Sequence, residues 1–313
     1  MDRLHPIIVL YVFTVLLMTG CASNTARIPP SINLLENHTV NTTTVQGHTI
    51  AYLDEGQGPP VILIHGFGGS MWQWEHQQEA LAEHYRVITL DMVGSGLSDK
   101  PEINYSPTFL LESVLGFMDN LGIQQATLIG NSLGAGVAIG MALTYPERVS
   151  KLVLISGFPA QILENIESPS YKRFITTRPP IWLARLATWL VGRWTTKHIL
   201  QEIIYDPERV TPLLIERSYQ NRVGHGSFYP LYSQIDQIPE WETRFAPKLR
   251  NIVQPTLVIW GDHDRIFPPA VGQILHQTIS HSKFFKVPNA GHIPQWENPQ
   301  SVNPVLLQFF QST

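Results

Sequence analysis

Short runs of apolar residues alternate with longer amphipathic stretches in two parts of this chain. The runs have the length of buried strands, and the stretches between them have the length and spacing of helices. Strands are expected at residues 61–64, 86–90, 126–129, 152–155, 255–260 and 283–287. Helices are expected at residues 73–84, 107–121, 133–144 and 270–279, with a last helix after Pro299. This alternation predicts an α/β fold with a mostly parallel central sheet flanked by helices.

Two segments, one at the start of the domain and one in its middle, depart from the alternation. The first is made of two strand-like runs. Thr39 to Gln46 and His48 to Leu53 are rich in threonine, valine and isoleucine, which indicates a leading hairpin. The second segment, from Phe158 to about Pro247, has no strand pattern, and apolar residues recur in it at helical spacing: Trp182, Leu183, Leu186, Trp189 and Leu190. We therefore predict one α/β domain made of residues 38–157 and 248–313, interrupted by a helical insertion at 158–247.

The N-terminus has the pattern of an export signal. Arg3 precedes an apolar stretch from Ile7 to Met18, which is short for a membrane span and ends in small residues. Leu17 to Cys21 resembles the lipobox of bacterial lipoproteins, in which the cysteine is acylated and becomes the new N-terminus. We expect residues 1–20 to be a signal peptide, Cys21 to be lipidated, residues 21–37 to be a tether, and the protein to be anchored in a bacterial cell envelope. An ordinary cleaved signal and an uncleaved anchor are the alternatives.

Composition narrows the choice of partners. The chain has 313 residues, of which 43% are hydrophobic and 15% charged, with a net charge of -4. This balance gives no electrostatic basis for nucleic-acid binding and favours small molecules or lipids as partners. Cys21 is the single cysteine, so the chain has no intramolecular disulfide and no thiolate cluster for a metal. We expect neither a metal nor a cofactor.

Ser132 is the candidate nucleophile. It lies in Gly130-Asn131-Ser132-Leu133-Gly134, directly after an expected strand and at the start of an expected helix rich in small residues. This is the context of the G-x-S-x-G nucleophile elbow, in which a sharp turn leaves the serine exposed at the edge of the sheet. The N-terminus of the helix also favours developing negative charge.

A serine hydroxyl needs a nearby base, and the base needs a group that orients it. In this architecture the acid and then the histidine follow the serine along the chain. His292 lies in a loop after the last expected strand, and we predict it to be the base. The preceding strand is followed by two carboxylates. We favour Asp264 as the acid, because Asp262, directly after a glycine, is better placed to hold the turn through its own backbone.

The tetrahedral intermediate of such a reaction needs N–H donors for its oxyanion. His65 to Ser70 follows the strand at residues 61–64, at the place where these enzymes supply one donor. We predict the backbone N–H groups of Phe67 and Leu133 as the two donors. A phosphate loop is disfavoured because the glycines are not followed by Gly-Lys-Ser/Thr.

From about Thr39 to the C-terminus the chain resembles the α/β-hydrolase fold enzymes. The resemblance is carried by His65 to Gly68, Asp91 to Ser98, the serine elbow, Trp260 to Asp264 and Gly291-His292. It implies that residues 91–98 shape the loop near the site and that the insertion is the lid, or cap, of the family. Epoxide hydrolases and haloalkane dehalogenases of this group use an aspartate where this chain has Ser132, which disfavours both activities.

The substrate is less constrained than the fold. Asn131-Ser132 resembles carbon–carbon hydrolases of ring-cleavage products as well as carboxylesterases. The aromatic residues of the cap suggest an apolar pocket, although their spacing is also typical of helix packing or of contact with lipid: Phe174, Trp182, Trp189 and Trp194. We expect hydrolysis of an ester with an apolar acyl or alkyl part through an acyl-enzyme on Ser132.

Two other functions stay open at this stage. One is carbon–carbon hydrolysis of a diketone-like acid, for which cap arginines should hold a carboxylate near the site. The other is a ligand-binding envelope lipoprotein that has kept the fold without turnover.

Overall fold

The computed structural model describes residues 38–157, 160–223 and 228–311, with the backbone alone for 187–191 and 222–223. The expected signal peptide (1–20), Cys21 and the tether (21–37) lie outside the described residues. No helix within the described ranges combines the length and the apolar character that a bilayer span requires.

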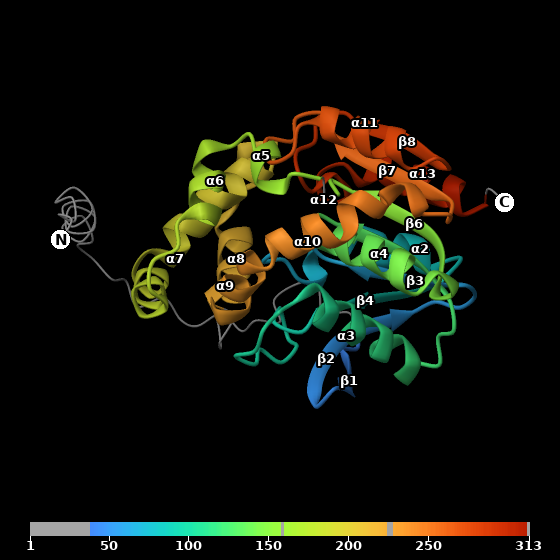
Figure 1. Cartoon of the computed structure of the whole chain (residues 1–313), viewed down its shortest axis with the longest axis horizontal. Coiled ribbons are helices and arrows are strands. Elements are labelled where there is room, and N and C mark those ends of the chain that lie inside the picture. Colours follow the sequence, from blue (N-terminus) through green and yellow to red (C-terminus); the bar gives the residue numbers. More distant parts are fainter. Residues whose placement is uncertain (1–37, 158–159, 224–227, 312–313) are drawn as a thin grey trace.

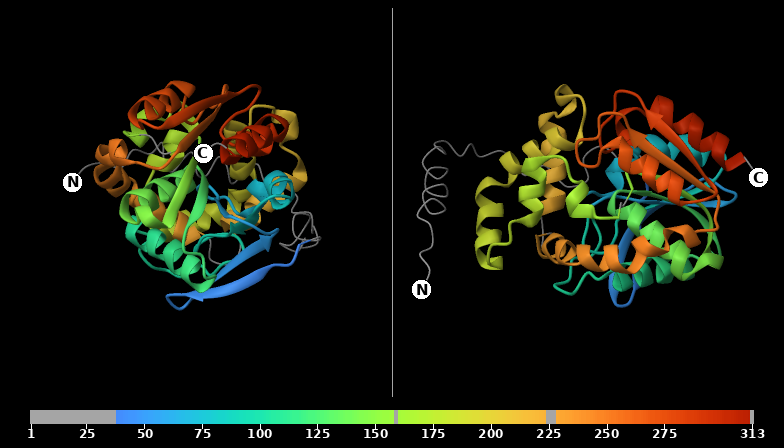
Figure 2. Two further views of the ribbon diagram at one scale, coloured as in Figure 1. Left: turned by 90° about the vertical axis from the view of Figure 1, so that its right-hand side faces the viewer. Right: turned by 45° about the horizontal axis from the view of Figure 1, so that its top comes forward.

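One eight-stranded sheet forms the centre of the protein (Figures 1 and 2). Its spatial order is β1-β2-β4-β3-β5-β6-β7-β8, with β1 and β2 antiparallel to their neighbours and all later pairs parallel. The strands are β1 (Asn41–Val45), β2 (His48–Glu55), β3 (Pro60–Ile64), β4 (Arg86–Leu90), β5 (Ala126–Asn131), β6 (Val149–Ile155), β7 (Thr256–Gly261) and β8 (Ser282–Val287).

Helices cover both faces of this sheet, and this explains why its central strands are apolar without alternation. On one face, Leu81 of α2 (Glu75–Ala82) and Leu306 of α13 (Pro299–Gln311) share a core with β3 and β7. On the other face lie α3 (Pro107–Asn120), α4 (Leu133–Thr144) and α11 (Pro269–Thr278). The parallel strands thus lie between two helical layers, and loops extend from their carboxyl ends.

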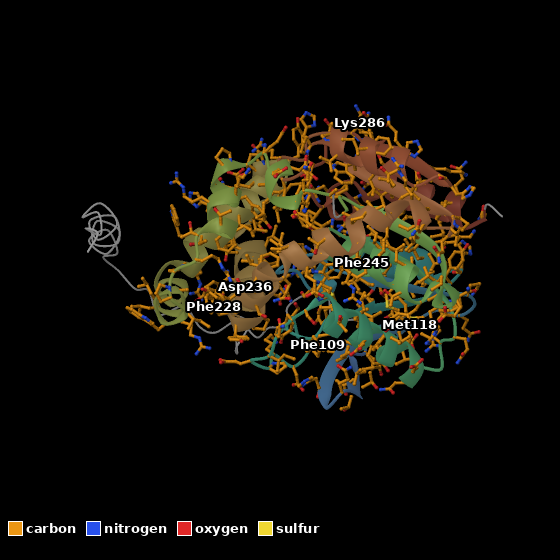
Figure 3. All side chains as sticks on the ribbon, in the orientation of Figure 1. Phe109, Met118, Phe228, Asp236, Phe245 and Lys286 are labelled. Carbon is orange, nitrogen blue, oxygen red and sulfur yellow. The ribbon has the colours of Figure 1, made fainter. Side chains whose placement is uncertain are left out.

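Between β6 and β7 the chain leaves the core and forms the helical insertion, here called the cap. Its helices are α5 (Ile162–Asn165), α6 (Pro169–Thr176), α7 (Ile181–Ile203), α8 (Pro212–Val223), α9 (Phe228–Asp236) and α10 (Ile238–Phe245). In Figure 1 most of the cap lies to the left of the sheet, and α10 leads back to the core. The labels Phe228 and Asp236 in Figure 3 mark the two ends of α9.

The predicted fold class is confirmed, and the differences are local. β6 begins at Val149 rather than at residue 152, because Ser150 and Lys151 are only half-buried and interrupt the apolar run. The helix expected at residues 73–84 is a short 3-10 turn (Met71–Trp74) followed by α2. A short helix, α12 (Pro294–Glu297), which the apolar pattern did not predict, follows His292.

Candidate active site

Ser132 lies at a strained turn between β5 and α4. Its backbone φ is 51° and its ψ is −113°, a region that non-glycine residues rarely adopt and that commonly costs about 1–3 kcal/mol. The two flanking glycines make the turn possible. A Cβ at residue 130 would lie 2.2 Å from the backbone of Gly134, and a Cβ at residue 134 would lie 2.1 Å from the Ile64 oxygen. The local geometry is therefore that of a nucleophile elbow.

Asp264 and His292 lie close together in the protein interior, 3% and 5% exposed. The Oδ2 atom of Asp264 lies 2.9 Å from Nδ1 of His292. The other oxygen, Oδ1, accepts the N–H groups of Ile266 (2.8 Å) and Phe267 (3.0 Å), which fixes the carboxylate. An Nδ1–H that donates to this carboxylate leaves Nε2 of the ring free to accept a proton.

Asp262 is turned to other partners. Its Oδ1 lies 2.6 Å from Nδ1 of His263, which is exposed, and accepts the Ala290 N–H at 3.3 Å. The expectation that Asp262 holds the turn through its own backbone is wrong. Asp264 accepts the N–H groups two and three residues ahead of it. It therefore holds both the turn and the histidine.

The serine elbow and the histidine loop are joined through Asn131. Its Nδ2 donates to the carbonyl oxygens of His292 (3.0 Å) and Ile155 (3.2 Å). Phe267 lines the cavity at Ser132 and packs edge-on against the His292 ring, with centroids 5.6 Å apart. Between the described side chains of Ser132 and His292 there is no hydrogen bond. In enzymes without substrate such bonds are often long and shorten when the substrate is bound.

The loop after β3 passes directly against the elbow. A Cβ at residue 66 would lie 3.3 Å from the Ser132 Cβ, and the Gly66 N–H donates to Gln73 Oε1 at 2.9 Å. Phe67 and Leu133 both line the cavity at Ser132. The structure thus places the two residues predicted to supply the oxyanion donors at the same cavity as the serine, one in the loop after β3 and one at the start of α4.

The cavity at Ser132 measures about 50 Å³, which is room for no more than a few water molecules. Among its described lining residues none is charged: Phe67, Ser132, Leu133, Ile162, Ile166, Tyr171, Ile175, Gln234, Ile235, Ile238, Trp241, Ile266 and Phe267. The cap arginines expected for an acid substrate are not among them. Of the aromatic cap residues singled out in the sequence, Trp182 and Trp194 are exposed, and the Trp189 side chain lies outside the described residues.

Gln234 of α9 is a polar residue of this cavity that sequence reasoning missed. Its side chain is 5% exposed, and Nε2 is buried without a hydrogen-bond partner in the described part of the protein. An unpaired buried donor costs about 1–3 kcal/mol, so the cavity offers a ready N–H to an acceptor on a ligand. Nothing in the sequence marked this glutamine among the other polar residues of the cap.

Glu297 of α12 is the second missed residue. Its Oε1 accepts the N–H groups on both sides of His292, from Gly291 (2.9 Å) and Ile293 (3.4 Å). Its Oε2 accepts the Tyr205 N–H, just after the end of α7 in the cap, at 2.7 Å. Burial raises the pKa of Glu297 to about 7, against the opposing effect of these three N–H donors. Glu297 therefore holds the histidine loop to the cap.

The other buried titratable groups nearby are structural. Burial lowers the pKa of His65, whose Nε2 accepts the Met92 N–H at 3.1 Å, which fits a neutral ring. Burial raises the pKa of Asp91, and its two oxygens accept the N–H groups of Met71 and Leu97, both at 2.7 Å. Asp91 therefore holds the 91–98 loop to the start of the 3-10 turn. In the described ranges no three His, Cys, Asp or Glu side chains form a metal-binding group.

Comparison with known proteins agrees with this geometry. Residues 59–299 match the family described as alpha/beta hydrolase fold. The chain is similar to a 2-hydroxy-6-oxononadienedioate/2-hydroxy-6-oxononatrienedioate hydrolase of Paraburkholderia phymatum, at 32% identity over 83% of this chain and 90% of the relative.

Solved structures give the same result. A meta-cleavage product hydrolase from Pseudomonas fluorescens IP01 is similar at a TM-score of 0.73 and 28% identity, covering 86% of this chain and 97% of that one. A thermophilic esterase from Thermogutta terrifontis is similar at a TM-score of 0.67 and 25% identity, covering 87% and 97%. The sheet order, the elbow and the matched residues lead to one conclusion: the chain belongs to the α/β-hydrolase fold family.

Proposed function

We propose that this protein is a serine hydrolase in which Ser132 is the nucleophile, His292 the general base and Asp264 the group that orients the base. The observation that carries the proposal is the buried Asp264–His292 pair, joined through Asn131 to the strained turn that presents Ser132. A structural histidine would need neither the carboxylate nor a neighbouring serine on an elbow.

In this mechanism the Ser132 Oγ attacks the substrate carbonyl carbon while Nε2 of His292 takes its proton. The oxyanion that forms accepts the N–H groups of Phe67 and Leu133. Asp264 stabilises the imidazolium. The tetrahedral intermediate then breaks the bond to the leaving group, which takes the proton from His292, and the acyl group stays on Ser132. Water, deprotonated by His292, releases the acid and restores the serine.

The bond that is cleaved is proposed to be a carbon–carbon bond next to a ketone. The names of the hydrolase from Paraburkholderia phymatum and of the meta-cleavage product hydrolase support this choice, since both are similar to this chain over most of its length. In this reaction the leaving group is a carbanion, and the proton that His292 carries quenches it.

Hydrolysis of an apolar ester is the second candidate, and the wall of the cavity favours it. The wall is apolar and, over its described residues, uncharged, with Gln234 as its amide donor. Such a wall suits a neutral ester or ketone better than a dicarboxylate, because an unpaired charge there would lose its hydration.

The decisive experiment compares two substrates on one preparation. We would measure kcat/KM for 2-hydroxy-6-oxo-6-phenylhexa-2,4-dienoate and for p-nitrophenyl butyrate, with Ser132→Ala as the control. The faster reaction identifies the bond class. If neither substrate is turned over and a fluorophosphonate does not label Ser132, the hydrolase proposal is wrong.

We also propose that the mature protein is anchored to a bacterial envelope membrane through a lipidated Cys21. Support comes from the sequence of residues 1–21 and from two exposed tryptophans of α7, Trp182 (66% exposed) and Trp194 (64% exposed). Exposed indole rings are enriched where proteins meet the membrane interface.

A further inference from the structure

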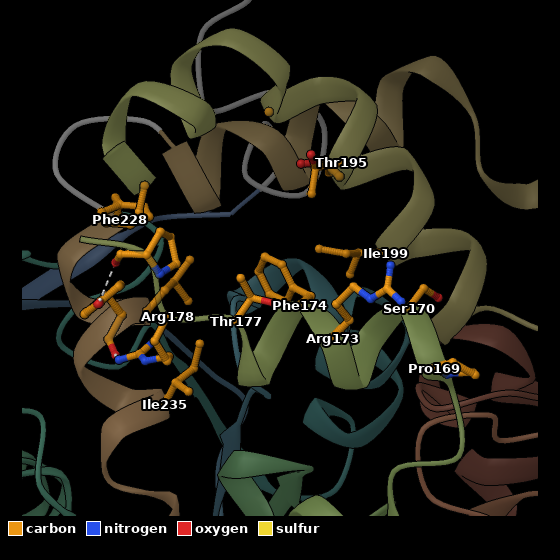
Figure 4. Close-up of a pocket in the computed structure, with 16 residues that line it drawn as sticks. Pro169, Ser170, Arg173, Phe174, Thr177, Arg178, Thr195, Ile199, Phe228 and Ile235 are labelled. Carbon is orange, nitrogen blue, oxygen red and sulfur yellow. Dashed lines mark hydrogen bonds between the residues drawn. The ribbon is translucent and has the colours of Figure 1, made fainter. Parts of the chain in front are cut away.

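The cap contains a second cavity that is much larger than the one at Ser132. It measures about 630 Å³ and lies between α6, α7 and α9 (Figure 4). Cavities of this size and apolar character are typical of sites for small organic ligands. Its apolar wall is supplied by Phe174 of α6, Ile199 of α7 and three residues of α9: Phe228, Leu231 and Ile235.

The two cavities are neighbours with a thin wall between them. Ile235 lines both, and residues of α6 and of its C-terminal end line one cavity or the other. Tyr171 and Ile175 face the cavity at Ser132, whereas Phe174 and Thr177 face the cap cavity, as Figure 4 shows for the latter two. A group that extends from the Ser132 cavity along α9 therefore meets the Ile235 side chain first and the cap cavity next.

The cavity at Ser132 is too small to hold a whole substrate, and the cap cavity offers the additional volume. An organic ester or ketone of useful length does not fit in about 50 Å³ next to Ser132. The adjoining space is apolar, and burying a methylene group there strengthens binding about fourfold. Two arginines also line it, Arg173 and Arg178. The Arg178 guanidinium stacks on Tyr232 (3.7 Å) and pairs with Asp236, which is 53% exposed.

We propose that the cap cavity binds the apolar chain of the substrate and that Ile235 is the partition through which the chain passes. The inference rests on the proposed serine hydrolysis, because it takes the carbonyl at Ser132 as the other end of the ligand. The ligand class is a carbonyl compound with a long unbranched hydrocarbon part and without polar groups along it.

The proposal is tested with two adjacent threonines at the C-terminal end of α6, Thr176 and Thr177, which form a matched pair. Thr177 lines the cap cavity, whereas Thr176, also exposed, lines neither cavity. The readout is the ratio of kcat/KM for p-nitrophenyl dodecanoate to that for p-nitrophenyl acetate. In Thr177→Trp the indole occupies part of the cavity and displaces part of the chain. The ratio should fall about tenfold or more, since each displaced methylene is worth about fourfold. In Thr176→Trp the ratio should equal that of the wild type.

Ile235 gives a test of direction. Ile235→Ala removes the partition and should raise the ratio, whereas Ile235→Trp thickens it and should lower the ratio. Melting curves and the rate of fluorophosphonate labelling show whether each variant is folded with a reactive serine. An unchanged ratio in both Thr177→Trp and Ile235→Trp overturns the proposal, and so does an equal fall in Thr176→Trp and Thr177→Trp.

A binding measurement separates this proposal from the proposed function. Ser132→Ala protein is titrated with cis-parinaric acid, a fatty acid whose fluorescence rises in apolar surroundings. Adding Thr177→Trp should weaken binding about tenfold, and adding Thr176→Trp should not. If no ester is hydrolysed and Ser132 is not labelled, the hydrolase proposal fails, and this titration alone then tests whether the cap cavity binds an apolar chain. Equal binding by the two double variants overturns the proposal for the cap cavity.

Discussion

The buried carboxyl of Glu297 should make the stability of the protein depend on pH. The pKa of Glu297 is raised from 4.5 to about 7, mainly because burial penalises its charged form. As pH rises from about 4.5 to about 7, the unfolded chain releases this proton and the folded protein keeps it. The free energy of unfolding therefore falls over this window, because the folded state binds more protons than the unfolded state.

The size of the effect follows from the difference in pKa. One pKa unit corresponds to about 1.4 kcal/mol, so the whole window contributes about 3 kcal/mol, and most of it lies between pH 5 and pH 8. Glu297→Gln abolishes the titration. The substitution also turns an amide NH₂ toward the Tyr205 N–H, which costs about 1–3 kcal/mol at every pH and adds no slope.

The assay is urea unfolding of the wild type and Glu297→Gln at a series of pH values between 5 and 8. The difference between the two proteins at each pH removes the contribution of every other titrating group. We expect the wild type to lose about 2–3 kcal/mol relative to the variant as pH rises. Parallel curves for the two proteins would refute the reasoning, because they would mean that Glu297 titrates equally in both states.

The remaining predictions concern the site and the anchor. Asp264→Asn should fold and lose about 10⁴-fold in kcat, whereas Asp262→Asn should keep most of its activity. Steady-state kinetics of the two variants test this. A large loss in Asp262→Asn and a small loss in Asp264→Asn would exchange the roles of the two residues. Gln234→Leu should leave the melting temperature unchanged or raise it, because the substitution removes an unpaired buried donor. The kcat/KM for substrates with a hydrogen-bond acceptor near Gln234 should fall about tenfold. A lower melting temperature would mean that Gln234 has a structural role. Cys21→Ala should release the protein from membranes in fractionation, and unchanged partitioning would contradict lipidation.

The sheet was predictable because its signals are local. Each central strand is a short apolar run between polar turns, and Gly130 and Gly134 mark the elbow at fixed spacing from Ser132. The order serine, acid, histidine along the chain then left few candidates. The architecture could therefore be deduced from pattern alone.

What the sequence did not reveal depends on contacts between distant segments. The Nε2 atom of Gln234 is buried without a partner at the cavity that Ser132 also lines, and Glu297 reaches Tyr205 across ninety-two positions of the chain. The role of Asp262 was misjudged because turn propensity does not tell which of two nearby carboxylates bonds the backbone ahead of it. Such assignments need the three-dimensional arrangement.

The place of the cap in the chain has a consequence for biosynthesis. β6 ends at Ile155 and its partner β7 begins at Thr256, so the ribosome must make the whole insertion before the sheet can grow past β6. Until then one edge of β6 has no neighbour, and an unpaired apolar edge invites pairing with other chains. Truncated products that stop within the cap should therefore aggregate, and a chaperone that shields this edge during synthesis should raise the yield of native protein.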